Sequence, residues 1–309
     1  MITSVFKKST IVNYALIGIL VVVFFFLNQK NNLLLVKTAH TFLKTVTSLL
    51  LLFISFFMVN FTVKKNNLTK DSSYTILFFL LFLMIFPSIL NDRNLLFANF
   101  FVVLAIRRLI SLQTLKDPKE KIFDASMWIF IAALFHFWCI LFIILVYISI
   151  IFHVSRDYRN WLLPFVAFVA TAVIFMFSAL VIDKSWISHI LNQTQTNLKL
   201  DYFTNNYQNM ALSFYAVIGL YFVFSMVFSL TNKPMILQAS YKKMIFGFLI
   251  GVTIFLISPE KNNSMLLFTF MPLSVMCTTN IEYSQNKMYQ EIVLSLLILG
   301  GFFSFFSQL

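Results

Sequence analysis

Residues 107–160 read RRLISLQTLKDPKEKIFDASMWIFIAALFHFWCILFIILVYISIIFHVSRDYRN, and this stretch decides the fold. It holds an apolar run from Met127 to Phe152 between a basic loop and a second basic pair, Arg156 and Arg159. The run has 26 residues, so a single helix would be roughly 39 Å long at 1.5 Å per residue. That is long for a hydrocarbon core of about 30 Å, although tilt can absorb the excess.

The same run can instead form two short helices, residues 122–135 and 137–152, that turn near His136. These helices would be about 21 and 24 Å long. With this hairpin the chain has eleven spans, and its 23 Lys and Arg divide 16 cytoplasmic to 7 external; with one helix there are ten spans and the division is 13 to 10. Cytoplasmic loops carry the excess of Lys and Arg. The run contains no Gly, Pro or Asn, and His-Phe-Trp is a poor turn, but the charges favour the hairpin. We therefore predict eleven spans, ten being the alternative, with a cytoplasmic N-terminus and an external C-terminus.

The composition predicts one all-α, polytopic transmembrane helical bundle over residues 1–309. Sixty percent of the residues are hydrophobic and 11% are charged, whereas soluble domains are about 45–50% apolar and about 25% charged. Apolar runs parted by short polar breaks are typical of transmembrane helices. The other spans are predicted over residues 11–27, 41–61, 74–90, 95–110, 161–181, 211–230, 244–258, 264–281 and 291–306.

The net charge of +12 is explained by positive residues that lie beside the apolar runs. Such residues set topology and contact lipid headgroups. We therefore expect a multi-pass protein of a bacterial inner membrane whose first partner is the lipid bilayer, and we do not expect nucleic-acid binding.

No metal and no cofactor is expected from the sequence. Cys139 and Cys277 both fall inside apolar runs, which indicates neither a disulfide nor a metal site. The four histidines are scattered, without the i, i+4 pair that is typical of zinc sites on helices. The chain also lacks a phosphate-binding Gly-rich loop, an HExxH motif and a GxSxG motif.

A candidate anion site lies at the external end of the second span. Lys37, His40 and Lys44 follow one another at spacings of three and four residues, which places them on one helical face. Arg93, in the turn after the third span, is the fourth candidate, because a guanidinium binds phosphate in a bidentate way. These groups would hold the phosphate or diphosphate of an anionic lipid. The alternative is that the lysines only reach the membrane interface with their long side chains.

Three further charged residues are candidate partners of this site. Asp92 lies in the turn beside Arg93, and Glu260 and Lys261 lie in the external turn after residue 258. A carboxylate that paired with the basic groups would make the cluster structural, since positive charges gathered at a low-dielectric boundary need a counter-charge.

The longest polar segment, about 182–209, is predicted to be external. The apolar spacing from Trp186 to Leu198 predicts an amphipathic helix over residues 184–203 that lies flat on the outer face. It either roofs a cavity or serves as a plain connector.

Two blocks, RRLISLQT…KIFDASMWI (107–129) and SPEKNNSMLLFTFMPLS (258–274), carry a resemblance to a known family. The chain resembles an uncharacterised family of bacterial multi-pass inner-membrane proteins of similar length, and this resemblance extends over most of the chain but implies no activity. Its architecture also resembles that of the exopolysaccharide and O-antigen polymerases, which have many short spans and charged external turns. Many of those polymerases have a large external loop that this chain lacks.

Two functions from different classes stay open, so the sequence does not decide whether the protein is an enzyme. The first is a non-catalytic membrane subunit or assembly factor of a cell-envelope complex for secretion, motility or surface assembly. The second is a glycan-lipid polymerase or transferase that acts at the outer leaflet on a polyprenyl-diphosphate-linked sugar, with Asp92 or Glu260 as base. A transporter fits worst, because transporters show repeats and broken helices, whereas this chain has six Gly and no detectable repeat. The expected partners are an anionic or polyprenyl lipid and other envelope membrane proteins.

Overall fold

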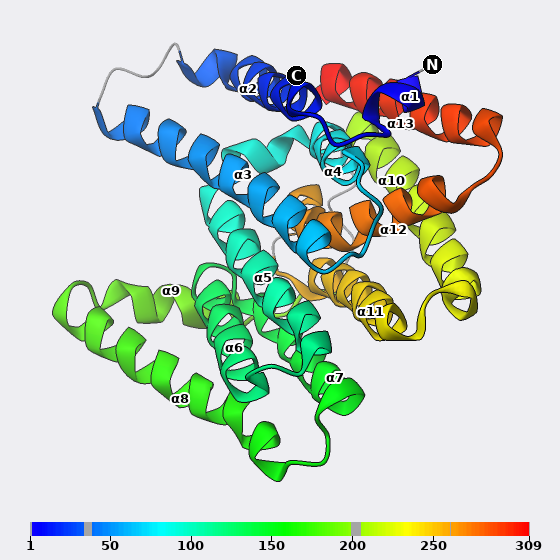
Figure 1. The fold of residues 1–309 in the computed structure, drawn as a ribbon. Coiled ribbons are helices and arrows are strands. Elements are labelled where there is room, and N and C mark those ends of the chain that lie inside the picture. Colours follow the sequence, from blue (N-terminus) through cyan, green and yellow to red (C-terminus); the bar gives the residue numbers. More distant parts are fainter. Residues whose placement is uncertain (1, 34–38, 199–204, 260, 309) are drawn as a thin grey trace.

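The computed structural model describes residues 2–33, 39–198, 205–259 and 261–308, and these form one bundle of helices (Figure 1). The α-helices are α1 (Ile2–Phe6), α2 (Ile11–Leu33), α3 (Ala39–Lys65), α4 (Tyr74–Ile85), α5 (Arg93–Ser111), α6 (Pro118–Phe135), α7 (Ile143–His153), α8 (Tyr158–Val181), α9 (Ser185–Gln193), α10 (Asn206–Ser229), α11 (Met235–Ile257), α12 (Phe270–Tyr283) and α13 (Lys287–Gln308). Short 3₁₀ helices connect some of them: η1 (Pro87–Asn91), η2 (Leu112–Thr114), η3 (Phe137–Phe142), η4 (Leu230–Asn232) and η5 (Asn263–Thr269).

The predicted class, an all-α polytopic membrane bundle, is confirmed. Within the described residues, eight helices are long and apolar enough to cross a membrane. Each predicted span coincides with one helix or with a helix and its adjoining 3₁₀ segment. The third span changes form near its end because Pro87 lacks an amide hydrogen and disfavours α-geometry at the preceding residue. Phe86 accordingly has φ −127° and ψ 74°, and the chain continues as η1.

The run from Met127 to Phe152 breaks at His136, as predicted. His136 has an extended backbone, φ −142° and ψ 105°, between α6 and η3. Residues of α6 and α7 lie close together although His136 and the six residues of η3 separate the two helices, so the chain turns back on itself here. The number of membrane crossings stays a prediction.

Distant segments stabilise this break. The His136 ring lies 3.2 Å from the Ser258 hydroxyl through Nε2 and stacks on Phe268 at 5.7 Å between ring centroids. The amide of Phe137 donates to Gln193 Oε1 at 3.1 Å. The side chain of Gln193 thus provides a partner for one backbone amide at the break, and the residues after α11 hold the His136 ring in place.

The centre of the bundle is formed by α4 and α12. Every residue of α4 is buried, and 94% of the apolar window of residues 263–283 is buried. Aromatic rings pack between these helices, and Tyr215 of α10 contacts Phe82, Phe86 and Phe270 edge-on or tilted, with ring centroids 5.2–5.8 Å apart. The polar groups in this core are paired: the Thr75 hydroxyl donates to Thr278 at 3.1 Å.

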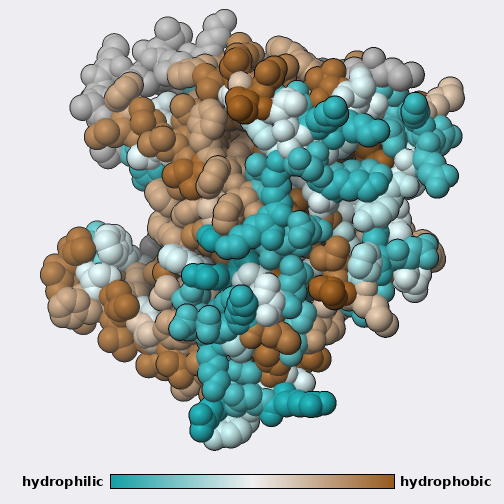
Figure 2. All heavy atoms as spheres, viewed as in Figure 1, coloured by the Kyte–Doolittle hydropathy of each residue, from teal (hydrophilic) through white to brown (hydrophobic). Residues whose placement is uncertain are grey.

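The outer helices expose apolar side chains instead of polar ones. Phe177 of α8 is 72% exposed and Phe228 of α10 is 79% exposed. Such a surface is stable against hydrocarbon and not against water. In Figure 2, hydrophilic residues form a band across the face in view, and apolar residues lie on both sides of it, including the lobe of α8 and α9.

The connections between helices form two sets, and the first set includes the N-terminal segment. We call it the N-terminal end; it comprises residues 2–10, 64–73, 111–121, 153–160, 230–243 and 282–291. Bonds within it join Ser73 to Phe6, Tyr241 to Leu68, Gln113 to Asn66 and to Ser240, and Lys119 to Asp157.

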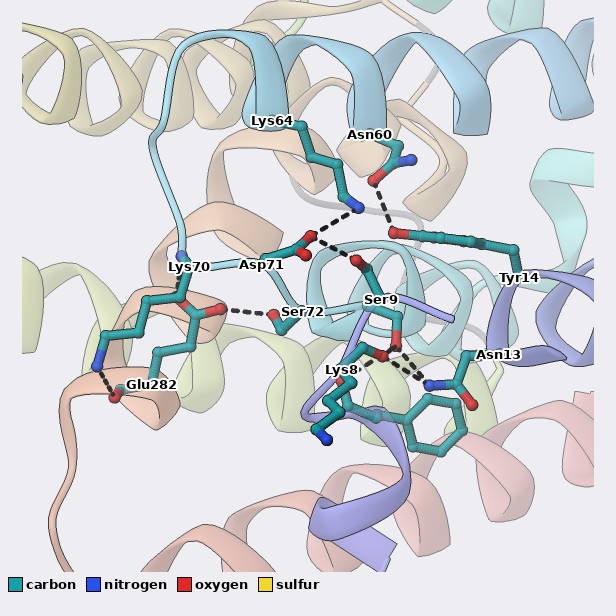
Figure 3. Close-up of polar contacts among 12 residues, drawn as sticks. Lys8, Ser9, Asn13, Tyr14, Asn60, Lys64, Lys70, Asp71, Ser72 and Glu282 are labelled. Atoms are coloured by element: carbon teal, nitrogen blue, oxygen red, sulfur yellow. Dashed lines mark hydrogen bonds and ion pairs between the residues drawn. The ribbon is translucent and has the colours of Figure 1, made fainter. Parts of the chain in front are cut away.

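Asp71 ties the N-terminal segment to α3 (Figure 3). Its Oδ1 lies 3.0 Å from Lys64 Nζ and also accepts a hydrogen bond from the Ser9 hydroxyl. These two hydrogen bonds, that from Ser9 first, favour the ionised carboxyl and lower the pKa of Asp71. Because Asp71 is largely exposed, this ion pair adds little stability.

Glu282 ties the connection between α3 and α4 to the end of α12 (Figure 3). Its carboxylate accepts hydrogen bonds from the Lys70 amide at 2.8 Å and from the Ser72 hydroxyl. The Lys70 ammonium donates in turn to the Glu282 carbonyl at 3.0 Å. Residues 70 and 282 therefore belong to the same end of the molecule.

The second set of connections, which we call the opposite end, comprises residues 28–33, 86–94, 136–137, 182–198, 257–259 and 261–264. Bonds within it join Gln29 to Asn91, Ser88 to Ser264, His136 to Ser258 and Asn197 to Ile257. The end of α13 belongs to it too, because Gln308 Nε2 donates to the Ile85 carbonyl at 3.0 Å.

The helix predicted over residues 184–203 is shorter than expected, and the prediction of its length was wrong. It runs as α9 from Ser185 to Gln193, and residues 195–198 are not helical. The amide of Asn197 donates to the Ile257 carbonyl, and Lys261 Nζ donates to the Asn197 carbonyl. These bonds to the end of α11 replace the bonds that a continued helix would make.

Candidate functional site

Two of the residues predicted to bind an anion, Lys44 and Arg93, lie at or near the opposite end. Lys37 and Glu260 are outside the described residues, as is the side chain of His40. Lys44 is exposed on α3, and Arg93 is half-buried at the first position of α5. No bond joins Lys44 to Arg93 in the described part of the chain, and the four-residue cluster stays a prediction.

Two of the predicted charged partners have structural contacts. Asp92 caps α5: its Oδ1 accepts a hydrogen bond from the Leu95 amide at 3.1 Å, as side chains at this position commonly do. Lys261 donates to the Asn197 carbonyl and so fastens the segment after α9.

A cleft of about 480 Å³ lies between α6, α8 and α9. We call it the apolar cleft. Its wall consists of Met127, Ile131, Leu134 and Phe135 from α6, Ala170, Thr171, Ile174, Phe175 and Ser178 from α8, Trp186 and Ile190 from α9, and Asn94 from α5. Its volume is typical of small-molecule sites.

Helical spacing explains how the wall forms. On α6, Met127, Ile131 and Leu134 recur at intervals of four and three residues, and on α8, Ala170, Ile174 and Ser178 recur at intervals of four. The hydroxyl of Thr171 donates back to the Ala167 carbonyl at 2.9 Å, so it offers the cavity mainly its methyl group. The cleft can therefore accommodate a hydrocarbon chain.

The rim of the cleft is polar where α5 begins. Asn94 is exposed there, and it directly follows Arg93 at the start of α5. A side chain as long as arginine's can reach the rim from this position. The first amides of α5 add the partial positive charge of a helix N-terminus. Arg93 does not line the cleft, but its position next to Asn94 places a cation beside an apolar wall, which suits an anionic amphiphile.

A comparison with known protein families matches residues 1–308 to one of them, described as a family of unknown function, DUF6427. The chain belongs to the DUF6427 family. No curated protein and no solved structure matches it. The resemblance to an uncharacterised family is thereby confirmed.

The sequence did not reveal the wall of the cleft in this DUF6427 protein. The same positions of α6 and α8 have the composition of lipid-facing surface, and only the relative placement of the helices makes them a cavity. The amphipathic spacing of Trp186 and Ile190 was the one available signal, because it indicated a helix that could roof a cavity.

The sequence also did not reveal that two lysines of the DUF6427 chain, Lys233 and Lys243, are buried. Both are among the 16 Lys and Arg residues that were predicted to be cytoplasmic. Lys243 is 2% exposed. Its ammonium donates to the Leu109 carbonyl at 2.6 Å and lies 3.1 Å from His153 Nε2. It therefore joins α11 to the ends of α5 and α7. The sequence feature that could have indicated the burial of Lys243 is its position directly before the apolar run of residues 244–258.

Proposed function

We propose that this protein is a non-catalytic inner-membrane subunit of a cell-envelope assembly that holds an anionic lipid by its hydrocarbon chain. The hydrocarbon chain of the lipid occupies the apolar cleft, and its anionic headgroup lies at the rim beside Arg93. The observation that carries the proposal is the composition of the cleft wall, in which Asn94, Thr171, Ser178 and Trp186 are the only polar side chains and none is ionisable.

The occupant is a lipid because the helices around the cleft face hydrocarbon on their other sides. Val173 and Phe177 on the other side of α8 are 63% and 72% exposed, and Ile174 of the cleft wall is 68% exposed, so the cleft is continuous with a membrane-facing surface. A cleft in this position is accessible to the hydrocarbon chain of a lipid that already lies in the bilayer. Burial of its methylene groups contributes about 0.8 kcal/mol each relative to water, but far less relative to lipid.

The proposed topology has eleven crossings, a cytoplasmic N-terminal end and an external opposite end. The contacts support it. Lys70 touches Glu282, and eleven crossings place both on the cytoplasmic side, whereas ten crossings would place them on opposite sides. The 16 Lys and Arg of the cytoplasmic connections, against 7 outside, agree with the usual bias.

Cysteine labelling tests this topology. Cys139 and Cys277 are buried, so they contribute little background. With eleven crossings, Ser155→Cys is protected from an impermeant reagent in intact cells, and Gln308→Cys reacts. The reverse result would place the C-terminal half of the chain in the opposite orientation and contradict the hairpin at His136.

The alternative, a glycan-lipid polymerase or transferase, needs a hydrophilic pocket at the external end with charged groups that bind a diphosphate and accept a proton. The apolar cleft is not such a pocket, and the Asp92 carboxylate is engaged as the cap of α5. No observation on the described residues favours this function.

Lipid analysis of the purified protein tests the proposed function. Ala170→Trp places an indole in the cleft, and we expect it to abolish the copurification of the bound lipid. Val173→Trp, on the exposed side of α8 (63% exposed), is the matched control and should retain the lipid. Equal retention in both variants would refute the site. Extension of a polyprenyl-diphosphate sugar by the purified protein would refute the non-catalytic assignment.

A further inference from the structure

A second pocket, distant in sequence from the apolar cleft, contains a buried lysine. This polar pocket has a volume of about 360 Å³ and lies at the N-terminal end. It is lined by Tyr221, Ser225 and Ser229 of α10, Lys233 before α11, Thr279, Asn280 and Tyr283 of α12, Ser284 after it, and Tyr289 of α13. No carboxylate lines it.

Lys233 makes no ion pair in this pocket, although the Glu282 carboxylate lies near enough to favour its charged form. Lys233 is 6% exposed, and its Nζ lies 3.2 Å from the Tyr283 ring centroid and 5.7 Å from that of Tyr241. Within the described residues, Nζ has no ion pair and no hydrogen-bond acceptor. Burial, the largest effect, lowers the pKa of Lys233 to about 8. The nearby carboxylate of Glu282 already accepts bonds from Ser72 and Lys70.

The other polar groups form a chain of hydrogen bonds with a defined direction. The Tyr289 hydroxyl donates to Asn280 Oδ1 at 2.7 Å, so the Tyr221 hydroxyl, 2.7 Å from it, is the donor to Tyr289. The Asn280 amide nitrogen donates to the Ser225 oxygen. The hydroxyl proton of Ser225 is not used in these hydrogen bonds, so Ser225 can donate to a ligand together with the three N–H groups of Lys233. Ser225 and Lys233 are the donors that the pocket offers, because the hydroxyls of Ser229 and Thr279 donate to the Met226 and Met276 carbonyls.

We propose that the polar pocket binds a phosphate oxyanion, with Lys233 as its charged ligand and Ser225 as a hydroxyl donor. A phosphate group has several acceptor oxygens and can use converging donors at once. Desolvated ammonium groups need such a partner. The anion also removes the unfavourable burial of an unpaired charge.

The phosphate can belong to a phospholipid or to a soluble compound, and the surroundings favour the phospholipid. The helices that flank the pocket expose apolar side chains: Phe224 of α10 is 57% exposed, and Met288 and Ile292 of α13 are 72% and 55% exposed. A phosphodiester headgroup placed in the pocket would leave its acyl chains along these membrane-facing surfaces.

Binding to purified full-length protein in detergent tests the proposal, with phosphatidylglycerol and inorganic phosphate as separate probes. Native mass spectrometry gives the occupancy, and thermal stabilisation gives the affinity. Lys233→Gln should weaken phosphatidylglycerol binding at least about tenfold, because it removes a charge-assisted hydrogen bond. Lys287→Gln removes an exposed charge of the same end and should bind like the wild type.

Asn280→Asp provides a second variant that keeps the shape of the pocket. The new carboxylate can still accept from Tyr289, but it pairs with Lys233 and repels the anion, so binding should be lost while the protein stays folded. Competition by inorganic phosphate, with no preference for the lipid, would assign the site to soluble phosphate. Wild-type affinity for both probes in Lys233→Gln and Asn280→Asp would overturn the proposal.

Discussion

Gly251→Ala is the sharpest test of how α11 positions the opposite end of the bundle. A Cβ atom at residue 251 would lie 2.6 Å from Thr269 Cγ2 and 3.2 Å from the backbone of Phe268 and Thr269 in η5. Thr269 cannot easily turn away, because its hydroxyl donates to the Leu266 carbonyl at 2.6 Å and lies 2.5 Å from the Tyr215 hydroxyl. The backbone of η5 must therefore shift.

A matched variant, Gly247→Ala, isolates the cost of this overlap. At residue 247 the nearest atom to a new Cβ is Pro272 Cγ at 3.5 Å, which is ordinary contact. Both changes gain the same helix propensity, about 1 kcal/mol, so this term cancels in the difference between them. Overpacking costs about 1–3 kcal/mol.

We expect Gly251→Ala to be less stable than Gly247→Ala by that amount, with a Tm lower by several degrees in detergent. Because Phe268 of η5 stacks on His136, the reactivity of the buried Cys139 near the break should also increase. Equal Tm values for the two variants would show that α11 and η5 do not approach as closely as described.

Three further changes follow from the contacts. Asp92→Ala removes the cap of α5 and should cost about 0.5–2 kcal/mol, measured as unfolding in detergent, while Asp92→Asn should keep most of the stability. Lys243→Ala should cost about 2–4 kcal/mol in the same assay, because it leaves a cavity and removes the charge-assisted hydrogen bond to the Leu109 carbonyl. Phosphatidylglycerol binding to the polar pocket should weaken as the pH rises through about 8, where Lys233 loses its proton, because the phosphodiester stays ionised; constant affinity up to about pH 10, where an ordinary lysine titrates, would contradict this. The stability of the lipid-free protein should change with pH in the opposite direction. Because the pKa of Lys233 is lowered on folding, the unfolded chain binds more protons than the folded one above about pH 8, and the free energy of unfolding should rise there, unless Glu282 and Lys70 titrate with it.

The class of fold and the helices were predictable because each apolar run is long and each break is polar. The break at His136 was predictable for a different reason. Its residues give no turn signal, and the charges on either side of it, with those of later loops, indicated the hairpin. The bonds that stabilise it, from Ser258 and Gln193, come from residues far along the chain, which a single sequence does not connect.

The two pockets could not be predicted, because each depends on the relative placement of three or more helices. Lys233 was expected to mark only the cytoplasmic side, and its burial follows from the positions of Tyr283 and Tyr241. The overestimated length of α9 has a similar origin. Local spacing favoured a helix as far as Leu198, but the bonds of Asn197 to α11 outweighed it.

The two proposed lipid sites use different helices at opposite ends of the bundle, and this separation lets them be distinguished. The apolar cleft is formed by α6, α8 and α9, with Asn94 from α5, and the polar pocket by α10, α12 and α13 with Lys233. Distant sites without shared partners behave additively. Ala170→Trp should therefore remove one lipid and leave the effect of Lys233→Gln unchanged. If either variant emptied both sites, one lipid-dependent change of the whole bundle would explain the result better than two separate pockets.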